Sequence, residues 1–169
     1  MFYVRVKTIP LTQGFRAIVD DEDFDRVSRY KWIAWTKKEN GRIVQVYASR
    51  TFRRPNGKQR TEQLHRFILD IWDERHVDHI NRDALDCSRD NMRTCTNQQN
   101  NYNKGKRRDS TSGYKGVSWY PRYGKWVVRI GFGKSRRFLG YFTSPEAAAL
   151  AYNEAAKKLH GDFAVLNRV

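Results

Sequence analysis

The sequence has few cysteines and no long apolar segment. Its two cysteines, Cys87 and Cys95, are too few for a disulfide framework or a four-cysteine zinc site. No apolar run approaches the roughly 18 residues that a membrane-spanning helix needs, and the N-terminus lacks the continuous apolar block of a signal peptide. These absences predict a cytoplasmic protein that is not secreted and has no membrane partner.

Acidic residues are scarce relative to basic ones, with 18 Asp and Glu against 33 Lys and Arg and a net charge of +15. The excess is uneven: residues 1–60 carry +8, residues 61–100 carry −3 and residues 101–140 carry +10. A basic excess of this size favours a polyanionic partner, and nucleic acid is the first candidate. The alternative for the basic stretches is a solvated surface that keeps the protein in solution. The slightly acidic central segment is suited to a bound divalent metal.

Residues 1–62 have the turn and strand signals of a small, basic, β-rich module. A partly alternating run predicts a strand over residues 2–9. Two runs rich in aromatic and β-branched residues, joined through Asn40 and Gly41, predict a hairpin over residues 31–51. The whole sequence is 39% hydrophobic and 14% aromatic, which is enough for a buried core.

Helix signals appear twice in the N-terminal half. Acidic side chains at residues 20–22 favour a helix start, and apolar residues between 63 and 72 recur at helical spacing. Further along, residues 104–112 are polar and basic, and they predict a linker that lies on phosphate. The linker residues that we expect on DNA are Lys104, Lys106, Arg107 and Arg108.

The C-terminal third predicts a small sheet covered by one helix. Strand-like runs at residues 114–119, 125–132 and 136–142 are separated by proline and glycine, which is typical of a three-stranded antiparallel meander. Ser144, followed by a proline and a glutamate, predicts the start of a helix, and Gly161 predicts its end. The expected fold class is therefore α+β.

The central segment carries the sharpest chemical signal. Residues 77–80 predict the end of a strand, and residues 92–95 predict a second strand. Thr96, with Gln99 three residues later, is a capping box that predicts the start of a helix. In such a strand–loop–strand–helix hairpin, the strand end and the first helical turns can face each other.

Asp78 and Asn100 are the candidate metal ligands of this hairpin. They would supply two hard oxygen ligands suited to Mg²⁺, with positions left for water and phosphate. The imidazole of His79 could then take a proton from a water aimed at phosphorus, although neighbouring strand residues point to opposite faces unless the strand twists or bulges. The alternative is that Asp78 and His79 cap a turn and that Asn100 lies on the helix surface.

The spacing of these residues resembles a known motif. The Asp78-His79 pair is followed by an asparagine twelve residues after the histidine, Asn91, and by another nine residues further on, Asn100. This pattern resembles the HNH endonuclease motif in its phage and intron-encoded form, in which Asp replaces the first His and Asn the last. Surrounding segments that also match are Ile9-Pro10-Leu11, Tyr30-Lys31-Trp32, Leu64-His65-Arg66, Leu85-Asp86, Asn91-Met92-Arg93 and Thr96.

The resemblance implies a ββα-metal nuclease motif over residues 63–103 that hydrolyses DNA phosphodiester bonds. By similarity, Asp78 and Asn100 bind Mg²⁺, which Mn²⁺ can replace, and His79 is the general base. Asn91 is implied to hold the loop and to orient the histidine through a backbone contact.

Residues 113–169 resemble a second family, the Apetala-type (ethylene-response-factor) DNA-binding domain. The motifs that match are Tyr114-Lys115-Gly116-Val117, Gly124-Lys125-Trp126, Leu139-Gly140-Tyr141-Phe142, Glu146-Ala147-Ala148, Ala151-Tyr152 and Leu166-Asn167. In that family the strands lie in the major groove of DNA, which implies contacts from Lys115, Trp119, Arg122, Tyr123, Arg129, Arg136 and Phe138. One extra residue between Val117 and Gly124 leaves the register of Trp119 and Arg122 open.

Together the two resemblances imply a homing endonuclease of the phage type that acts on double-stranded DNA, in the host cytoplasm if a phage encodes it. One active site per chain favours a nick in one strand unless two copies meet, and a monomer on DNA is favoured. No zinc and no small-molecule cofactor are expected. A non-catalytic DNA-binding regulator and an RNA-binding protein are the alternative functions.

The cysteines and the remaining histidines have several possible roles. A zinc site of Cys87, Cys95, His76 and His65 is an alternative, but these residues lack the usual short spacing. His65 is otherwise expected either to approach the nuclease site, as indirect support or as a phosphate contact, or to be an ordinary helix histidine. His160 is interpreted as a helix C-terminal residue with no further role.

Overall fold

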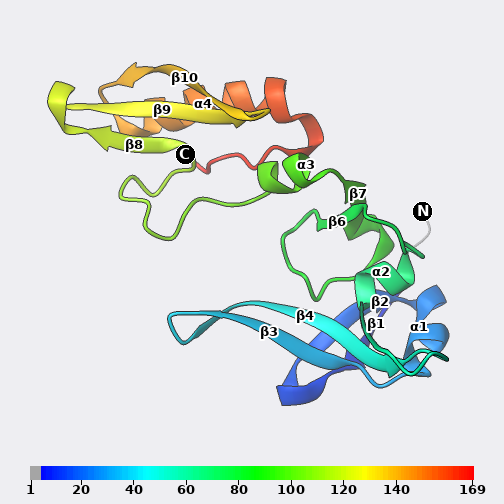
Figure 1. Ribbon diagram of the computed structural model, residues 1–169. Helices are drawn as coiled ribbons and strands as arrows, with labels where there is room; N and C mark the ends of the chain where they lie inside the picture. The colour runs from blue at the N-terminus through cyan, green and yellow to red at the C-terminus, as the bar shows by residue number, and fades with distance from the viewer. Residues whose placement is uncertain (1–4) are drawn as a thin grey trace. The chain divides into compact units, whose positions relative to one another are not determined.

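The chain forms two compact units, each of which contains both helices and strands (Figure 1). The computed structural model describes residues 5–169. The first unit ends at Cys95 and the second begins at Thr96. Their strands pair in small antiparallel sheets, so the predicted α+β class is confirmed. The boundary falls inside residues 63–103, and the division into four domains stays a prediction.

The first unit begins with a two-stranded sheet and a helix. β1 (Val6–Pro10) pairs antiparallel with β2 (Arg16–Asp20). α1 (Asp21–Ser28) follows directly at the predicted start, and the three acidic side chains of its first turn are favourable at the positive end of the helix dipole. The strand predicted over residues 2–9 is confirmed from residue 6 onward, whereas residues 2–4 lie outside the described residues.

A three-stranded antiparallel sheet follows, in the order β3-β4-β5. β3 (Ile33–Glu39) and β4 (Arg42–Arg53) form the predicted hairpin. Asn40 and Gly41 make its turn with φ angles of +50° and +76°, as a two-residue hairpin turn of type I′ requires. β5 (Gln59–Gln63) completes the sheet. It has no apolar residue, so no alternating pattern predicted it.

α2 (Leu64–Ile68) is shorter than the helix predicted over residues 63–72, and that prediction is wrong beyond residue 68. The helix ends because Asp70 adopts a φ of +54°, a left-handed conformation that cannot continue a right-handed helix. Apolar side chains from α2, the sheets and the loops share one core, which consists of Ile9, Ala17, Val19, Val27, Trp32, Ala48, Leu64, Phe67, Ile68, Cys87 and Met92.

β6 (His76–His79) and β7 (Met92–Cys95) form the predicted antiparallel hairpin. The loop between them is tied to β2 by the backbone of Ile18. The N–H of Ile18 donates to Leu85 O at 2.8 Å, and Ile18 O accepts from the N–H of Cys87 at 2.9 Å. The end of β6 is thus attached to the core of the first unit.

Two helices of the second unit begin at their predicted caps. Thr96 caps α3 (Asn97–Tyr102): its hydroxyl accepts from Gln99 N at 3.2 Å, while Gln99 Oε1 accepts from Thr96 N at 2.8 Å. The hydroxyl of Ser144 accepts the backbone N–H three residues later, at 3.1 Å, and caps α4 (Pro145–His160). The capping box and the start of α4 are therefore confirmed.

The sheet of the second unit is the predicted meander. β8 (Val117–Tyr120), β9 (Lys125–Phe132) and β10 (Ser135–Phe142) pair antiparallel in the order β10-β9-β8. α4 packs against one face of this sheet. The buried residues of this layer are Val117, Val128, Ile130, Ala148, Ala149, Tyr152 and Ala156.

Gly116 lies where α4 and the sheet meet closely. A Cβ atom there would stand 2.2 Å from the ring of Tyr152, and the residue has a φ of +78°. Both the space and the backbone conformation therefore require glycine at this position.

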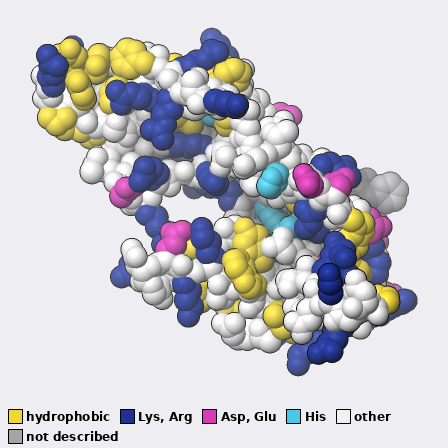
Figure 2. Space-filling view, viewed as in Figure 1, with side chains coloured by type: hydrophobic (Ala, Val, Ile, Leu, Met, Phe, Trp, Pro, Cys, Tyr) yellow, Lys and Arg dark blue, Asp and Glu magenta, His cyan; other side chains and the backbone are white. Residues whose placement is uncertain are grey.

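The surface is basic, as the composition indicates. Lys and Arg side chains are prominent on the face of the molecule shown in Figure 2. Among residues 5–169, no helix has the length and apolar character needed to cross a membrane.

Candidate functional site

Asp78 and His79 are buried neighbours at the end of β6, with 4% and 6% of their surfaces exposed. Asp78 lies opposite Arg93 on β7. The guanidinium of Arg93 reaches Asp78 Oδ2 from Nε at 2.9 Å and from Nη2 at 2.8 Å. A charge-assisted contact therefore balances this buried carboxylate.

His79 packs against a second buried histidine, His65 of α2. The two ring centroids are 5.1 Å apart and the rings are almost perpendicular, at 89°. Such an edge-to-face contact restricts how either ring can turn. His65 therefore lies against the proposed base, and its role in the nuclease site stays a prediction.

Burial favours the neutral form of both imidazoles. Burial, followed by the charges of His79 and Arg66, lowers the pKa of His65 to about 3. Burial also lowers the pKa of His79, against the opposing pull of nearby carboxylates, of which Asp78 is the first. A neutral His79 can accept a proton, as a general base must.

Asn91 closes the loop between β6 and β7. It ends the 3-10 turn η2 (Arg89–Asn91). Its Nδ2 donates to Asp86 O at 2.8 Å and to Asn81 Oδ1 at 3.0 Å, and its Oδ1 accepts from Asn81 N at 2.9 Å. Its backbone carbonyl accepts from the N–H of Ile80, the residue after the histidine, at 2.8 Å. These contacts support the implied loop-holding role, and its importance for catalysis stays a prediction.

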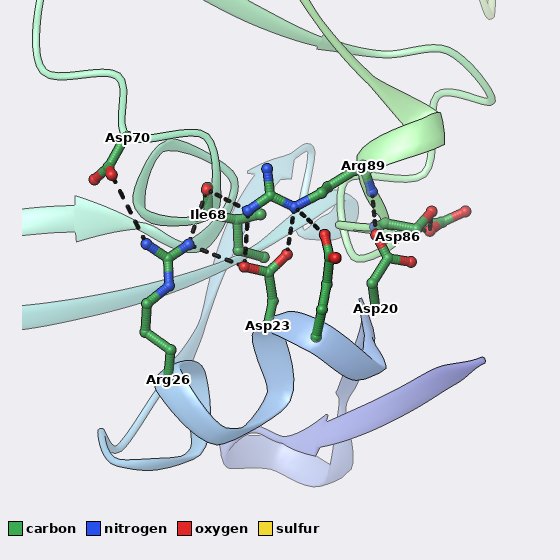
Figure 3. A network of polar contacts seen from close by, with 9 residues as sticks. Asp20, Asp23, Arg26, Ile68, Asp70, Asp86 and Arg89 are labelled. Atoms are coloured by element: carbon green, nitrogen blue, oxygen red, sulfur yellow. Dashed lines mark hydrogen bonds and ion pairs between the residues drawn. The ribbon is translucent and has the colours of Figure 1, made fainter. Parts of the chain in front are cut away.

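A network of ion pairs anchors the same turn from its other end (Figure 3). Arg89 donates to Asp23 from Nε at 2.7 Å and from Nη2 at 2.9 Å, and Arg26 donates to Asp23 at 3.0 Å. Both guanidiniums also donate to Ile68 O. The backbone N–H of Arg89 donates to Asp20 Oδ2 at 2.8 Å. The network therefore joins η2 to α1 and α2.

Asp20, Glu22 and Asp23 form a cluster that could in principle hold an ion. Within the part of the chain that the structure describes, it is the only group of three or more His, Cys, Asp or Glu side chains with ligand atoms so close together. Arg89 also reaches Glu22 Oε1 at 2.8 Å. Because Arg89 and Arg26 already pair with Asp23, and Arg89 with Glu22, we interpret the cluster as structural.

The two cysteines were the thiol ligands of the alternative zinc site. Cys87 and Cys95 are both buried, and no disulfide joins them. Burial raises the pKa of the Cys87 thiol, and the carboxylates of Asp86 and Asp83 raise it further. Zinc needs a thiolate, so Cys87 does not fit the alternative zinc site.

Asp78 and Asn100 fit a hard divalent cation by the chemistry of their donors. One carboxylate oxygen and one amide oxygen are ligands that Mg²⁺ accepts, together with several waters. Asn100 is half-buried on α3, in the second unit, whereas Asp78 lies in the first. The pairing of these two residues around one ion stays a prediction.

Two aromatic residues next to the histidine pair were missed from the sequence. The ring of Tyr47 on β4 lies 6.0 Å from that of His65, and the ring of Trp35 on β3 lies 5.9 Å from that of Tyr47. Trp35 is 49% exposed. A row of rings thus runs from His79 to the surface of the first unit. In the sequence, only the Leu64-His65-Arg66 motif pointed to this part of the site.

Arg129, Arg136 and Phe138 share the face of the second sheet that is turned away from α4. Phe138 lies directly opposite Arg129, and Arg136 lies two residues from Phe138 on the same strand, so the three point to one face. The alternate residues Val128 and Ile130 pack with α4 instead. All three predicted residues are exposed.

Aromatic rings extend this outer face. Tyr141 contacts Phe138 at 5.0 Å, Tyr123 at 5.1 Å and Tyr120 at 5.7 Å between ring centroids. The exposed Arg122 lies 5.9 Å from the ring of Tyr123. Exposed rings beside arginines suit nucleic acid. Tyr120 and Tyr141 were not predicted, because their role depends on strand register.

Two predicted DNA-binding residues lie apart from this face. Trp119 pairs with Trp126, at 5.1 Å between rings, on the side that α4 covers. Lys115 Nζ donates to Tyr102 O at 2.6 Å. Their contacts with DNA stay predictions. The predicted linker residues Lys104, Lys106, Arg107 and Arg108 are all exposed.

Comparison with known proteins identifies two similarities. Residues 71–102 match the HNH endonuclease family. An uncharacterized HNH endonuclease of Acanthamoeba polyphaga mimivirus is 31% identical over 165 residues, which cover 93% of this chain and 77% of that protein. No solved structure matches the chain.

The second similarity is to plant proteins. Dehydration-responsive element-binding protein 2C of Arabidopsis thaliana is 46% identical over 66 residues, and dehydration-responsive element-binding protein 2E of Oryza sativa subsp. japonica is 42% identical over 66 residues. Each match covers 38% of this chain but only 19% and 20% of the two plant proteins. This is a partial match to Apetala-type (ethylene-response-factor) DNA-binding proteins.

These similarities indicate DNA as the partner of this chain. HNH nucleases generally use divalent metal ions. Because the mimivirus relative matches nearly the whole chain and the family match spans the β6–β7 hairpin and α3, the chain belongs to the HNH endonuclease family.

Proposed function

We propose that this protein is a homing-type, phage-type DNA endonuclease that uses Mg²⁺ to hydrolyse phosphodiester bonds at a recognised site in double-stranded DNA. The observation that carries the proposal is the buried pair of Asp78 and His79 at the end of β6, where burial favours the neutral form of the imidazole. A neutral imidazole beside a metal-binding carboxylate is what hydrolysis by an activated water needs.

His79 acts as the general base and takes the proton of the attacking water. Asp78 and Asn100 would hold the metal, and Arg93 orients Asp78 through its two contacts with Oδ2. A Mg²⁺ ion held there would stabilise the negative charge that develops on the phosphate and on the leaving group. His65 limits the movement of the His79 ring.

The second unit supplies DNA binding in this proposal. The exposed Arg129, Arg136 and Phe138 contact DNA from the outer face of the sheet, and the exposed linker arginines Arg107 and Arg108 contact phosphate. One proposed site per chain supports a monomer that nicks one strand. A DNA partner is compatible with a cytoplasmic location, in the host cell if a phage encodes the protein.

Nicking of supercoiled plasmid tests the proposal. The parent protein should convert supercoiled to open-circular plasmid in Mg²⁺ or Mn²⁺, and EDTA should block the reaction. His79→Ala should lower the rate by about 10²–10⁴-fold while its affinity for duplex DNA in EDTA stays that of the parent.

Two results would contradict the proposal. Binding of DNA without nicking in any divalent metal would favour the alternative, a DNA-binding regulator. Nicking by His79→Ala at the parental rate would remove His79 from the mechanism.

A further inference from the structure

α3, the helix that carries the proposed ligand Asn100, is only six residues long. An isolated helix of this length is not stable in water. Its capping box satisfies its N-terminus, but other contacts must hold it. Several such contacts lie within the second unit, which contains both α3 and the Apetala-like sheet and helix.

Tyr102, the last residue of α3, makes most of these contacts. Its ring stacks on the ring of His160 with centroids 3.8 Å apart and an angle of 12° between planes. Its backbone carbonyl accepts from Lys115 Nζ at 2.6 Å. Its hydroxyl accepts from the N–H of Gly133 at 3.3 Å and from Gln98.

His160 supplies the other half of the stack. It is the last residue of α4 and is 7% exposed. Its Nε2 donates to Gly131 O at 2.7 Å, because a carbonyl oxygen can only accept. The ring is thus fixed against β9, at the C-terminal end of α4 where His160 was predicted.

The rest of α3 presents one side to the same unit. Asn97, Gln98, Asn101 and Tyr102 line a pocket of about 470 Å³ together with side chains of the sheet and of α4. At 100° per residue, Asn100 lies about 130° around the helix axis from the middle of these four positions. The docking contacts therefore leave Asn100 on a different side of α3.

We propose that the stack of Tyr102 on His160 is a clamp that holds α3 on the DNA-binding unit and thereby positions Asn100. Tyr102 and His160 are positioning residues for Asn100, and both lie with it in the second unit. This inference rests on the proposed function, in which Asn100 binds the metal.

Hydrogen exchange in the full chain, without DNA or metal, tests whether the clamp holds α3. The probe is the backbone amide of Asn100, which donates to Thr96 O at 3.0 Å. Tyr102→Ala and His160→Ala should each speed its exchange by about tenfold. In the double variant this amide should exchange only slightly faster than in the faster of the two single variants, because both substitutions remove the same stacking contact.

Tyr102→Phe is the matched control because it keeps the stacked ring and removes only the hydroxyl. Lys157→Ala, on the exposed side of α4, is a second control. Both should leave the exchange of the Asn100 amide close to that of the parent. Parental exchange in Tyr102→Ala and His160→Ala would overturn the clamp.

Plasmid nicking tests what the clamp does for catalysis. Tyr102→Ala and His160→Ala should lower the nicking rate by about 10²-fold, as expected for a displaced ligand, and raise the Mg²⁺ concentration needed for half-maximal rate. Their affinity for duplex DNA in EDTA should equal that of the parent protein. Tyr102→Phe should keep most of the parental nicking rate.

The two levels of inference fail in different ways. A parental nicking rate in both alanine variants, or a rate that falls only in proportion to DNA affinity, would overturn the positioning role. A parent protein that makes no nick in any divalent metal would overturn the proposed function and, with it, the positioning role. The hydrogen-exchange result would still decide whether the clamp holds α3.

Discussion

Replacing Asn91 by alanine should weaken the loop that follows His79. The side chain makes three hydrogen bonds, one to Asp86 O and two with Asn81. A hydrogen bond of this kind contributes about 1 kcal/mol to stability, so Asn91→Ala should lower the unfolding free energy of the first unit by about 2–3 kcal/mol. For a unit of this size, that corresponds to a loss of roughly 10–20 °C in Tm.

Thermal unfolding followed by circular dichroism, together with plasmid nicking, measures the two effects. Asn56→Ala is the matched control, because Asn56 is an exposed asparagine of the same unit with one local bond, to Lys58 N. The control should change stability by less than about 1 kcal/mol. Asn91→Ala should also nick more slowly, since its loop fixes the residue after His79. Stability of Asn91→Ala within about 0.5 kcal/mol of the parent would refute this reasoning.

Three further predictions concern pH, the ion-pair network and the linker. Because the pKa of His65 is about 3 when folded and 6.5 when unfolded, its stabilising contribution is present above pH 6.5 and is lost as the pH falls, at about 1.4 kcal/mol per pH unit. In urea unfolding, His65→Phe should remove this part of the pH dependence of the unfolding free energy. An unchanged slope of that free energy against pH would contradict the prediction. Asp23→Ala should cost the first unit about 2–4 kcal/mol by leaving Arg89 and Arg26 without their buried partner, which thermal unfolding would detect; a cost below about 1 kcal/mol would show that the network is not structural. Neutralising Arg107 and Arg108 should reduce the log–log salt slope of DNA binding by about 0.9 per lost phosphate contact, and an unchanged slope would show that the linker does not touch phosphate.

Features that depend on local chemistry were predictable from the sequence. Asn40-Gly41 specifies a tight hairpin turn because both residues tolerate positive φ. Thr96 and Gln99 specify a helix start because each side chain bonds the backbone of the other. The hairpin and α3 therefore appear where they were expected.

Features that depend on contacts between distant residues were not predictable. Asp23 and Arg89 meet across 66 residues of sequence, and no local pattern joins them. β5 lacks apolar residues, so only its pairing with β4 makes it a strand. The helix predicted over residues 63–72 ended early because Asp70 is left-handed.

In the candidate site, too, local features were predictable from the sequence and contacts between distant residues were not. The spacing of Asp78, His79 and Asn91 was visible in the sequence and pointed to one hairpin. The support given by His65 was an open alternative, because it depends on how α2 packs beside β6. The stack of Tyr102 on His160 was missed altogether, because it joins two helices that are far apart in the chain.

Anomalous scattering from crystals of the DNA complex grown in Mn²⁺ tests the central claim most directly. The account predicts one anomalous peak per chain, within bonding distance of Asp78 and Asn100 and beside the ring of His79. A complex with ordered duplex and no peak at Asp78, or with manganese bound only at the Asp20–Asp23 cluster, would contradict it.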